Sequence, residues 1–454
     1  MLSASIPDAY LVSRFINKSV PFQFRGRQYN FDLSQGLFSS AGVDSGTLLL
    51  LKVFSRILDE DAAAGKAPPC RVLDAGCGAG IIGICAAGAL GEAPANARIR
   101  CQDRDELARL VTAHNAAKNG IHSPALEAYT EPLLAGPPGC GWDLILTNIP
   151  AKAGKPVLED FTGRAAGLLN PGGRVIMVAV HTLADFFRRE IAAAGAPLLL
   201  EVKGPAHCVF VYGGISAPGT PAGPVNAGPG FPERYPFYLR NEAVCAIEDI
   251  PVRIEAVHGA SGFDSPGGAA EAAARLILRI GPRNLSFSDY FPLLVHEPDQ
   301  GFFPCWLLSY LQMQNIAPPE NSLVLSGRNI LALEAALHNA VRNNKAAVRS
   351  VPAVDLCLGG EALLEASGGR QYGFIAAFPE LLSQKGAGDL WDSLPPLLAD
   401  GGIFLASFGS SGAERFDRLK PSGYTRLGGV KRKGFRALAY KRFDEKRELE
   451  PPHL

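Results

Sequence analysis

The amino-acid sequence contains two copies of one pattern. "CQDRDELARLVTAHNAAKNG" from residue 101 matches "LSGRNILALEAALHNAVRNN" from residue 325 without a gap. "LLNPGGRVIMVAV" returns as "LLADGGIFLASFG", and "EVKGPAHCVFVY" returns as "GVKRKGFRALAY". Several matches in the same order, at an offset of about 220 to 229 residues, indicate a duplicated domain. The chain must therefore adopt one architecture twice.

A segment dense in proline and glycine lies between the copies. Residues 214–236, "GISAPGTPAGPVNAGPGFPERYP", have almost no periodic apolar pattern, which is typical of a linker. We therefore predict a domain over 1–213, a linker over 214–236 and a second domain over 237–454. In the first copy, strand-like and helix-like segments alternate, which predicts an α/β fold with a mainly parallel, doubly wound sheet in each domain.

Composition narrows the class of protein. The 44 Lys+Arg balance the 44 Asp+Glu, so the net charge of the chain does not indicate a nucleic-acid binder. A neutral chain can still carry a local basic patch. The nine cysteines form no CxxC pair and no zinc-like cluster, and we expect reduced thiols, no metal and a cytoplasmic protein. No apolar run has membrane-spanning length, so we expect no membrane partner.

A glycine loop in the first copy carries the first candidate site. "RVLDAGCGAGIIGICAAGAL" predicts a buried strand, a loop and a helix, with Gly76, Gly78 and Gly80 leaving backbone open to a ligand. Asp74 precedes the loop, and Asp103 ends the next strand, where an acid can accept hydrogen bonds from a ribose diol. The loop lacks the GK[ST] of a phosphate-binding loop, so an acid there suits a cationic amine instead. Both aspartates could alternatively cap the helices that follow.

A second candidate lies in "DLILTNIPAKAGK", where an apolar strand stops at Asn148. Asparagine and proline commonly end a strand in a simple turn. However, ligands of doubly wound sheets bind beyond the carboxyl ends of the strands. Asn148 would then point into the same crevice as Asp74 and Asp103.

"VLDAGCGAG", the acid after the second strand and "TNIPAKAGK" together resemble the class I S-adenosylmethionine-dependent methyltransferases. The chain is most similar to their small-domain group of rRNA guanine-N2 methyltransferases, strongly over about 20–213 and weakly over about 240–443. "GLFSSAGVDSGTLLLLK" at 36–52 and the "VKGPAHCVFVY" hairpin also resemble that group. The resemblance implies S-adenosylmethionine as cofactor and RNA as partner, specifically rRNA or a ribosomal subunit. It also implies a set of cofactor-binding residues: Asp74, Gly76, Gly78 and Gly80 at the methionine end, Asp103 at the ribose, and Thr130 or Glu131 near the adenine.

The same resemblance assigns Asn148, Ile149 and Pro150 to catalysis, in place of an Asn-Pro-Pro motif. The Asn148 side-chain oxygen and the Ile149 carbonyl could each accept one N–H of a planar exocyclic amine. No strong base is required, because the methylated nitrogen can lose its proton to water. The sequence departs from the family's motif at two positions. Ile149 replaces the first proline and is expected to loosen the turn, and Ala151 offers no aromatic side chain on which a flipped base could stack.

The second copy is predicted to be degenerate and to recognise substrate. In the alignment, "VLDAGCGAG" becomes "LVHEPDQGF" at 294–302, so that Phe302 falls opposite Gly80, and Ala377 falls opposite Asn148. His114 and His338 occupy matched places and are interpreted as helix-packing residues. The stretch "RLKPSGYTRLGGVKRKGFRALAYKRF" interleaves basic and aromatic residues, which favours RNA docking.

Three functions remain open from the sequence. The first is methylation of an exocyclic base nitrogen in RNA, with guanine N2 of rRNA favoured. The second is methylation of a protein glutamine amide, which presents the same planar N–H geometry to Asn148. The third is a non-catalytic protein that binds RNA or a partner and keeps the ligand site for stability.

Overall fold

The computed structural model describes residues 8–38, 40–91, 97–135, 141–215, 230–282, 285–349, 351–380 and 386–443. It contains two compact units, Asp8–Tyr238 and Leu239–Leu454, which we call the N-unit and the C-unit. Most of the predicted linker, residues 216–229, lies outside the described residues. None of the helices in the described ranges is long and apolar enough to cross a membrane.

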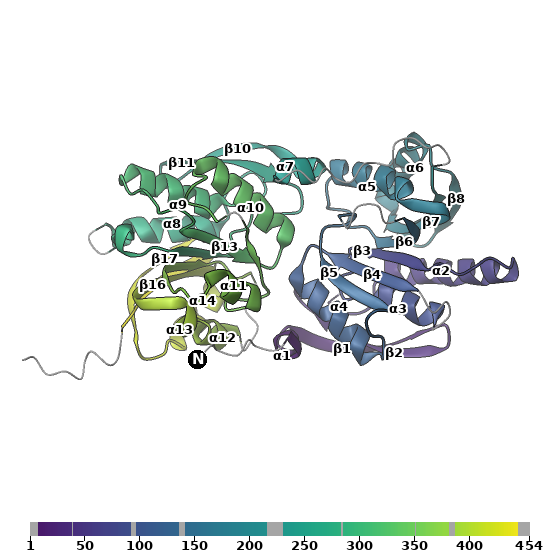
Figure 1. The fold of residues 1–454 in the computed structure, drawn as a ribbon, viewed down its shortest axis with the longest axis horizontal. Helices are drawn as coiled ribbons and strands as arrows, with labels where there is room; N and C mark the ends of the chain where they lie inside the picture. Colours follow the sequence, from purple (N-terminus) through teal and green to yellow (C-terminus); the bar gives the residue numbers. More distant parts are fainter. Residues whose placement is uncertain are drawn as a thin grey trace, which may run out of the picture. The chain divides into compact units, whose positions relative to one another are not determined.

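The N-unit is built on a seven-stranded sheet with the order β5-β4-β3-β6-β7-β9-β8 (Figure 1). Strands β5 to β7 in that order are parallel, while β9 runs antiparallel to β7 and β8. A separate hairpin, β1–β2, precedes the sheet. The elements are α1 (Asp8–Ser13), β1 (Ile16–Phe24), β2 (Arg27–Ser34), α2 (Ser45–Ala63), β3 (Arg71–Ala75), α3 (Ile81–Leu90), β4 (Arg98–Asp103), α4 (Glu106–Lys118), β5 (Leu126–Thr130), β6 (Trp142–Asn148), α5 (Lys155–Gly167), β7 (Leu169–Val180), α6 (Ala184–Ala193), β8 (Leu198–Lys203), β9 (His207–Gly213) and α7 (Phe231–Arg234).

The C-unit repeats this topology strand for strand, with the order β14-β13-β12-β15-β16-β18-β17 and a preceding hairpin β10–β11. The predicted α/β class with two mainly parallel sheets is therefore confirmed. Its elements are β10 (Leu239–Ile247), β11 (Ile250–Val257), α8 (Gly268–Ile280), β12 (Leu293–His296), α9 (Phe302–Met313), β13 (Leu323–Gly327), α10 (Ile330–Asn343), β14 (Ala353–Val354), α11 (Glu361–Ser367), β15 (Tyr372–Ala377), α12 (Gly386–Asp392), α13 (Leu394–Leu397), β16 (Leu398–Gly409), α14 (Ser410–Arg418), β17 (Tyr424–Arg432) and β18 (Phe435–Arg442).

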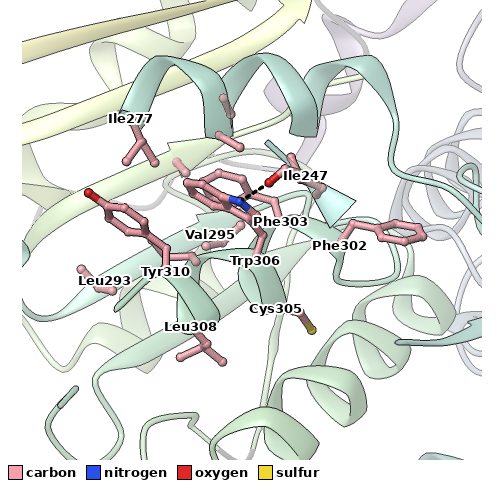
Figure 2. Packing of buried hydrophobic residues seen from close by; sticks show 14 of the residues in the cluster. Ile247, Ile277, Leu293, Val295, Phe302, Phe303, Cys305, Trp306, Leu308 and Tyr310 are labelled. Atoms are coloured by element: carbon pink, nitrogen blue, oxygen red, sulfur yellow. Dashed lines mark hydrogen bonds between the residues drawn. The ribbon is translucent and has the colours of Figure 1, made fainter. Parts of the chain in front are cut away.

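The C-unit keeps a complete apolar core. Trp306 of α9 stacks on Tyr310 one turn away, with ring centroids 5.4 Å apart, and on Phe303 at 5.8 Å. Its indole Nε1 donates to the carbonyl of Ile247 at 3.0 Å, which ties α9 to the hairpin (Figure 2). A buried indole needs such a partner because an unpaired N–H costs free energy. The second copy has therefore kept the packing that a stable fold requires.

One hydrogen-bonded contact recurs in both units. Asn115 of α4 donates to the carbonyls of Asp32 and Ala79 at 3.0 and 2.9 Å, fastening the helix to the hairpin and to the glycine loop. Asn339 of α10 makes the matching pair of bonds in the C-unit, to Glu255 and Gln300, at 3.1 and 2.9 Å. We call this contact the asparagine staple.

The histidine that precedes each staple residue contacts an acid of the hairpin. His114 lies 2.7 Å from Asp32, and His338 lies 2.7 Å from Glu255. This placement agrees with the interpretation of both histidines as packing residues of the helix.

Candidate active site

The glycine loop joins β3 to α3 in a left-handed conformation. Gly76, Gly78 and Gly80 have φ of +78°, +55° and +79°, values that favour glycine because a β-carbon is strained there. A β-carbon on Gly80 would lie 2.7 Å from the Thr112 side chain, so this glycine is also required by close packing. A β-carbon on Gly78 would have no atom within 4 Å. The surface of the loop at Gly78 is therefore open to a ligand.

Asp74 lies beneath the loop rather than at its mouth. The side chain is fully buried, and Oδ2 accepts the backbone N–H of Gly83 at 2.8 Å, which fastens the first turns of α3. Oδ1 is buried without a hydrogen-bond partner. Burial raises the pKa of Asp74 to about 7, against the bond from Gly83, and the nearby Asp103 raises it further. Oδ1 has spare hydrogen-bonding capacity, but it lies below the loop surface, so the contact of Asp74 with the cationic amine of S-adenosylmethionine stays a prediction.

The burial of Asp74 predicts a pH-dependent stability. Its folded pKa lies above the unfolded value, so the folded state loses stability as pH rises from about 4 through about 7. Asp74→Asn abolishes this titration. We expect the free energy of unfolding of the variant to rise relative to wild type between pH 5 and pH 8 by about 3 kcal/mol, because roughly two pKa units of the titration lie in this range at about 1.36 kcal/mol each. Calorimetry at both pH values measures the difference, and a difference independent of pH contradicts the prediction.

Asp103 ends β4 directly against the glycine loop. Its Oδ2 accepts the backbone N–H of Gly78 at 3.1 Å, and Oδ1 accepts that of Asp105 at 3.1 Å. Burial raises the pKa of Asp103, while the positive charge of Arg104 lowers it. The carboxylate thus lies beside the open loop surface, where the sequence predicted a ribose-binding acid.

Thr130 and Glu131 lie at the end of β5, next to Asp103. The backbone N–H of Glu131 donates to the Asp103 carbonyl at 2.7 Å, and its carboxylate pairs with Arg100 at 2.7 Å. The Thr130 hydroxyl bonds to Glu106. Both side chains are therefore held by protein partners, and their place near an adenine stays a prediction.

Sequence reasoning missed Leu133, which follows β5. Its backbone is left-handed (φ +29°), and its side chain would contact a β-carbon on Gly76 at 3.6 Å. The amide of Gln102 holds this turn by donating to the carbonyls of Leu133 and Ala135. An apolar side chain beside the glycine loop suits the face of a purine ring, and no motif around Leu133 marks it.

Asn148 is held from one side by the start of α2. Its amide Nδ2 donates to Asp44 Oδ1 and Oδ2 at 3.1 and 3.3 Å and to Thr47 Oγ1 at 3.1 Å. Because a carboxylate only accepts hydrogen bonds, it fixes which end of the amide faces it. The Asn148 Oδ1 atom is thereby turned away from Asp44. Asp44 was not a predicted site residue, although it belongs to the "GVDSG" segment.

The turn after Asn148 is held in place by the backbone of Ile149. Its N–H donates to the carbonyl of Val178 at 3.2 Å, a bond that proline cannot make. The Ile149 side chain is buried, and the carbonyl of the exposed Pro150 accepts the N–H of Ala153 at 3.0 Å. The expectation that isoleucine loosens this turn is wrong, because the extra donor extends the pairing with β7.

Asp44 also caps α2, so it should affect both stability and activity. Its Oδ1 accepts the N–H of Gly46 at 2.9 Å and that of Thr47 at 3.1 Å. We expect Asp44→Ala to cost about 1 kcal/mol of stability as a lost cap. We also expect kcat to fall by at least about tenfold, because the Asn148 amide can then rotate. As a matched control, Asn329→Ala removes the cap of α10 and should lower stability only; equal activity in both variants contradicts this role of Asp44.

The structure corrects the alignment of the two glycine loops by one residue. Gly80 precedes α3 with φ +79°, and Gly301 precedes α9 with φ +105°. Gly80 therefore matches Gly301 and not Phe302. Each glycine directly precedes its helix, so the loops match one residue away from the ungapped sequence alignment.

The C-unit residue that matches Asn148 also differs by one position from the sequence alignment. In the strand pairings, Leu146 of β6 and Ala376 of β15 occupy the same place. Asn148 therefore matches Phe378 and not Ala377. An aromatic ring in place of the amide removes the acceptor oxygen from the second copy.

The glycine loop of the C-unit keeps its backbone and fills its open surface. Glu297 and Asp299, which match Gly76 and Gly78, have φ of +56° and +49°. Such angles are rare for residues with a β-carbon. The Asp299 carboxylate accepts the backbone N–H of Gly262 at 2.9 Å, so a side chain occupies what is open space in the N-unit. At this position the C-unit therefore lacks the open loop surface that the N-unit offers to a ligand.

Comparisons with known proteins agree with this geometry. The Methyltransferase small domain family matches residues 28–188. Ribosomal protein L11 methyltransferase of Xanthomonas campestris pv. campestris is 36% identical over 148 residues, 33% of this chain and 43% of that protein. Uncharacterized protein YbxB of Bacillus subtilis is 30% identical over 158 residues, 35% of this chain and 71% of YbxB. Ribosomal RNA small subunit methyltransferase C of Actinobacillus pleuropneumoniae is 29% identical over 179 residues, 38% of this chain and 48% of that enzyme.

The matched stretch thus covers less than half of the L11 and rRNA enzymes. Both units together resemble a solved structure, T. thermophilus 16S rRNA N2 G1207 methyltransferase in complex with AdoMet and guanosine. That likeness has a TM-score of 0.57 at 15% identity and covers 94% of this chain and 98% of the other, which establishes a shared fold. The glycine loop, Asp103 and Asn148 lie at the ends of neighbouring strands, and the chain belongs to the methyltransferase small-domain family of S-adenosylmethionine-dependent methyltransferases.

Proposed function

We propose that the N-unit transfers a methyl group from S-adenosylmethionine to a planar exocyclic amine of RNA, with guanine N2 of ribosomal RNA as the favoured acceptor. The observation that carries this proposal is the fixed amide of Asn148. Asp44 and Thr47 hold its nitrogen, so its oxygen is directed away from them, and the next residue, Ile149, supplies a backbone carbonyl as a second acceptor. Two acceptors on consecutive residues suit a group that has two N–H donors on one nitrogen.

Each acceptor has a defined task in this reaction. The Asn148 oxygen and the Ile149 carbonyl accept the two hydrogens of the amine and orient its lone pair, and they stabilise the positive charge that develops on the nitrogen. The methylated nitrogen then loses a proton to water. S-adenosylmethionine supplies an electrophilic methyl group. Its binding residues are those of the loop and the neighbouring strand ends: Asp74, Gly76, Gly78, Gly80, Asp103 and either Thr130 or Glu131.

We assign substrate recognition to the C-unit, which has a fold but no open cofactor surface. Many basic side chains of its residues 418–443 form ion pairs with acidic residues of the same unit, which the sequence did not show. Arg432 and Lys433 both pair with Glu271, and the three further pairs are Arg426–Asp417, Arg436–Glu414 and Arg442–Asp400. Exposed ion pairs are weak, so phosphates can compete for these cations.

A protein acceptor is the second candidate. The similarity to ribosomal protein L11 methyltransferase, at 36% identity, favours an amine or amide of a ribosomal protein. A glutamine amide would meet the same two acceptors as a base amine. Both candidates place the acceptor on the ribosome.

The deciding experiment follows radiolabelled S-adenosylmethionine. We would incubate the full-length protein with hypomethylated ribosomal subunits, with transcribed 16S rRNA and with total protein, and compare wild type with Asn148→Ala. Label in RNA with wild type alone supports the proposal, and nucleoside analysis then identifies the base. Label in protein moves the function to the second candidate. Cofactor binding without any transfer would indicate a non-catalytic protein and would overturn both.

A further inference from the structure

His207 lies against the first turn of α2, beside the residues that hold Asn148. It is the first residue of β9, and its Nδ1 is 3.3 Å from the Ser45 hydroxyl. A β-carbon on Gly46 would lie 3.1 Å from His207 Cδ2 and 3.0 Å from Asp44 Oδ1. The imidazole and the Asp44 carboxylate therefore flank the same glycine.

The sheet places His207 at the edge that carries Asn148. Asn148 pairs with Val178 of β7, and Val180, two residues further along, pairs with His207 across the antiparallel ladder. One strand thus separates the two residues, which lie about 10 Å apart across the sheet and about 7 Å apart along it, or about 12 Å in all at the usual strand dimensions. The N-terminus of α2 bridges them, because Asp44 contacts Asn148 and Ser45 contacts His207.

The C-unit has a phenylalanine, Phe435, at the position that matches His207. Phe435 begins β18 as His207 begins β9, and a β-carbon on Gly268 would lie 2.6 Å from its ring. A flat ring against the first turn of the helix is therefore part of the fold. The C-unit does not repeat the three polar residues Asp44, Asn148 and His207. Gly267 caps α8 without a side-chain hydrogen bond, Phe378 replaces Asn148, and Phe435 replaces His207.

The C-unit lacks these three polar residues but keeps other polar contacts of the N-unit. The histidines that pack α4 and α10 keep their acidic partners in both units, at 2.7 Å in each. Polar residues that serve the fold thus persist in both copies, whereas Asp44, Asn148 and His207 occur together only beside the open glycine loop. A histidine at position 207 therefore supplies hydrogen bonding in addition to ring packing.

We propose that His207 determines acceptor specificity: Nε2 of its ring hydrogen-bonds a polar edge of the acceptor base, next to the amine that Asn148 engages. This rests on the proposed function. Nδ1 faces Ser45, and Nε2 makes no hydrogen bond with any residue that the structure describes. The charged or titratable groups of the neighbouring elements are Asp44 at the start of α2, His181 after β7 and Lys203 at the end of β8.

The test compares His207→Phe and His207→Gln with wild type, using transcribed 16S rRNA and radiolabelled S-adenosylmethionine. Phenylalanine preserves the packing that the C-unit uses, so we expect the melting temperature and cofactor Kd to be unchanged. KM for the RNA should rise about tenfold, the effect of one hydrogen bond, with a smaller change in kcat. Glutamine can still hydrogen-bond and should restore part of the affinity. His122→Gln, before β5 at the opposite edge of the sheet, should match wild type.

Different outcomes separate this proposal from the proposed function. If wild type labels no RNA, the proposed function fails and His207 has no base to recognise. If wild type labels RNA and His207→Phe has the same KM, only the role of His207 is overturned. If glutamine is worse than phenylalanine and lowers the melting temperature, the ring serves packing and the proposal is likewise overturned.

Discussion

Asn148→Ala is expected to lower kcat for methyl transfer roughly 10²–10³-fold, the usual cost of removing one acceptor or donor that stabilises developing charge. The Kd for S-adenosylmethionine should not change, because Asn148 contacts Asp44 and Thr47 and not the glycine loop. Single-turnover rates and calorimetric titration of the cofactor measure the two quantities. An unchanged kcat would exclude the amide from the reaction and remove the main support for the proposed function.

Two companion variants sharpen this result. Asn148→Asp is nearly the same size, but it places a second carboxylate about 3 Å from that of Asp44, where like charges raise one pKa strongly. We expect it to be no more active than the alanine variant near neutral pH. Phe378→Leu changes the matched position of the C-unit and should leave kcat unchanged.

Gly78→Asp is expected to abolish cofactor binding while the protein remains folded. The C-unit already has an aspartate at the matched position, Asp299, in the same left-handed conformation. A side chain at Gly78 would enter open space, so the cost to stability is that of the backbone strain, about 1–2 kcal/mol. The new carboxylate would occupy the ligand surface next to Asp103, raising the Kd roughly 100-fold or more.

Titration calorimetry with the full-length protein checks this prediction. Wild type should bind one S-adenosylmethionine per chain, and Gly78→Asp should bind none at concentrations that saturate wild type. Asp299→Gly is the reciprocal control and should leave the stoichiometry at one. Two sites in wild type, or a persistent site in Gly78→Asp, would show that the C-unit binds the cofactor.

The sequence predicted those features that depend on local patterns. The glycine loop, the acid that ends β4 and the strand that ends at Asn148 are each encoded within a few neighbouring residues. Parallel pairing then requires all of them to meet at one edge of the sheet. The duplicated fold was likewise predictable, because core positions keep their apolar periodicity in both copies.

The contacts around the acceptor site were not predictable from patterns. Asp44 and Asn148 are 104 residues apart, and Ser45 and His207 are 162 apart. No periodicity relates such pairs, and the register that joins them is set by packing of α2 against the sheet. The one-residue shift between the two glycine loops was also missed, because the backbone conformation and the helix starts that reveal it belong to the folded structure.

The loop of the C-unit shows that the left-handed backbone of this turn does not depend on glycine. Glu297 and Asp299 adopt it with side chains, and the asparagine staple binds the loop in both units. The same fold thus carries either glycine or a side chain at these two places, and the choice decides whether the loop surface is open or filled. Replacing the two C-unit residues by glycine one at a time would measure how much of that surface each side chain occupies.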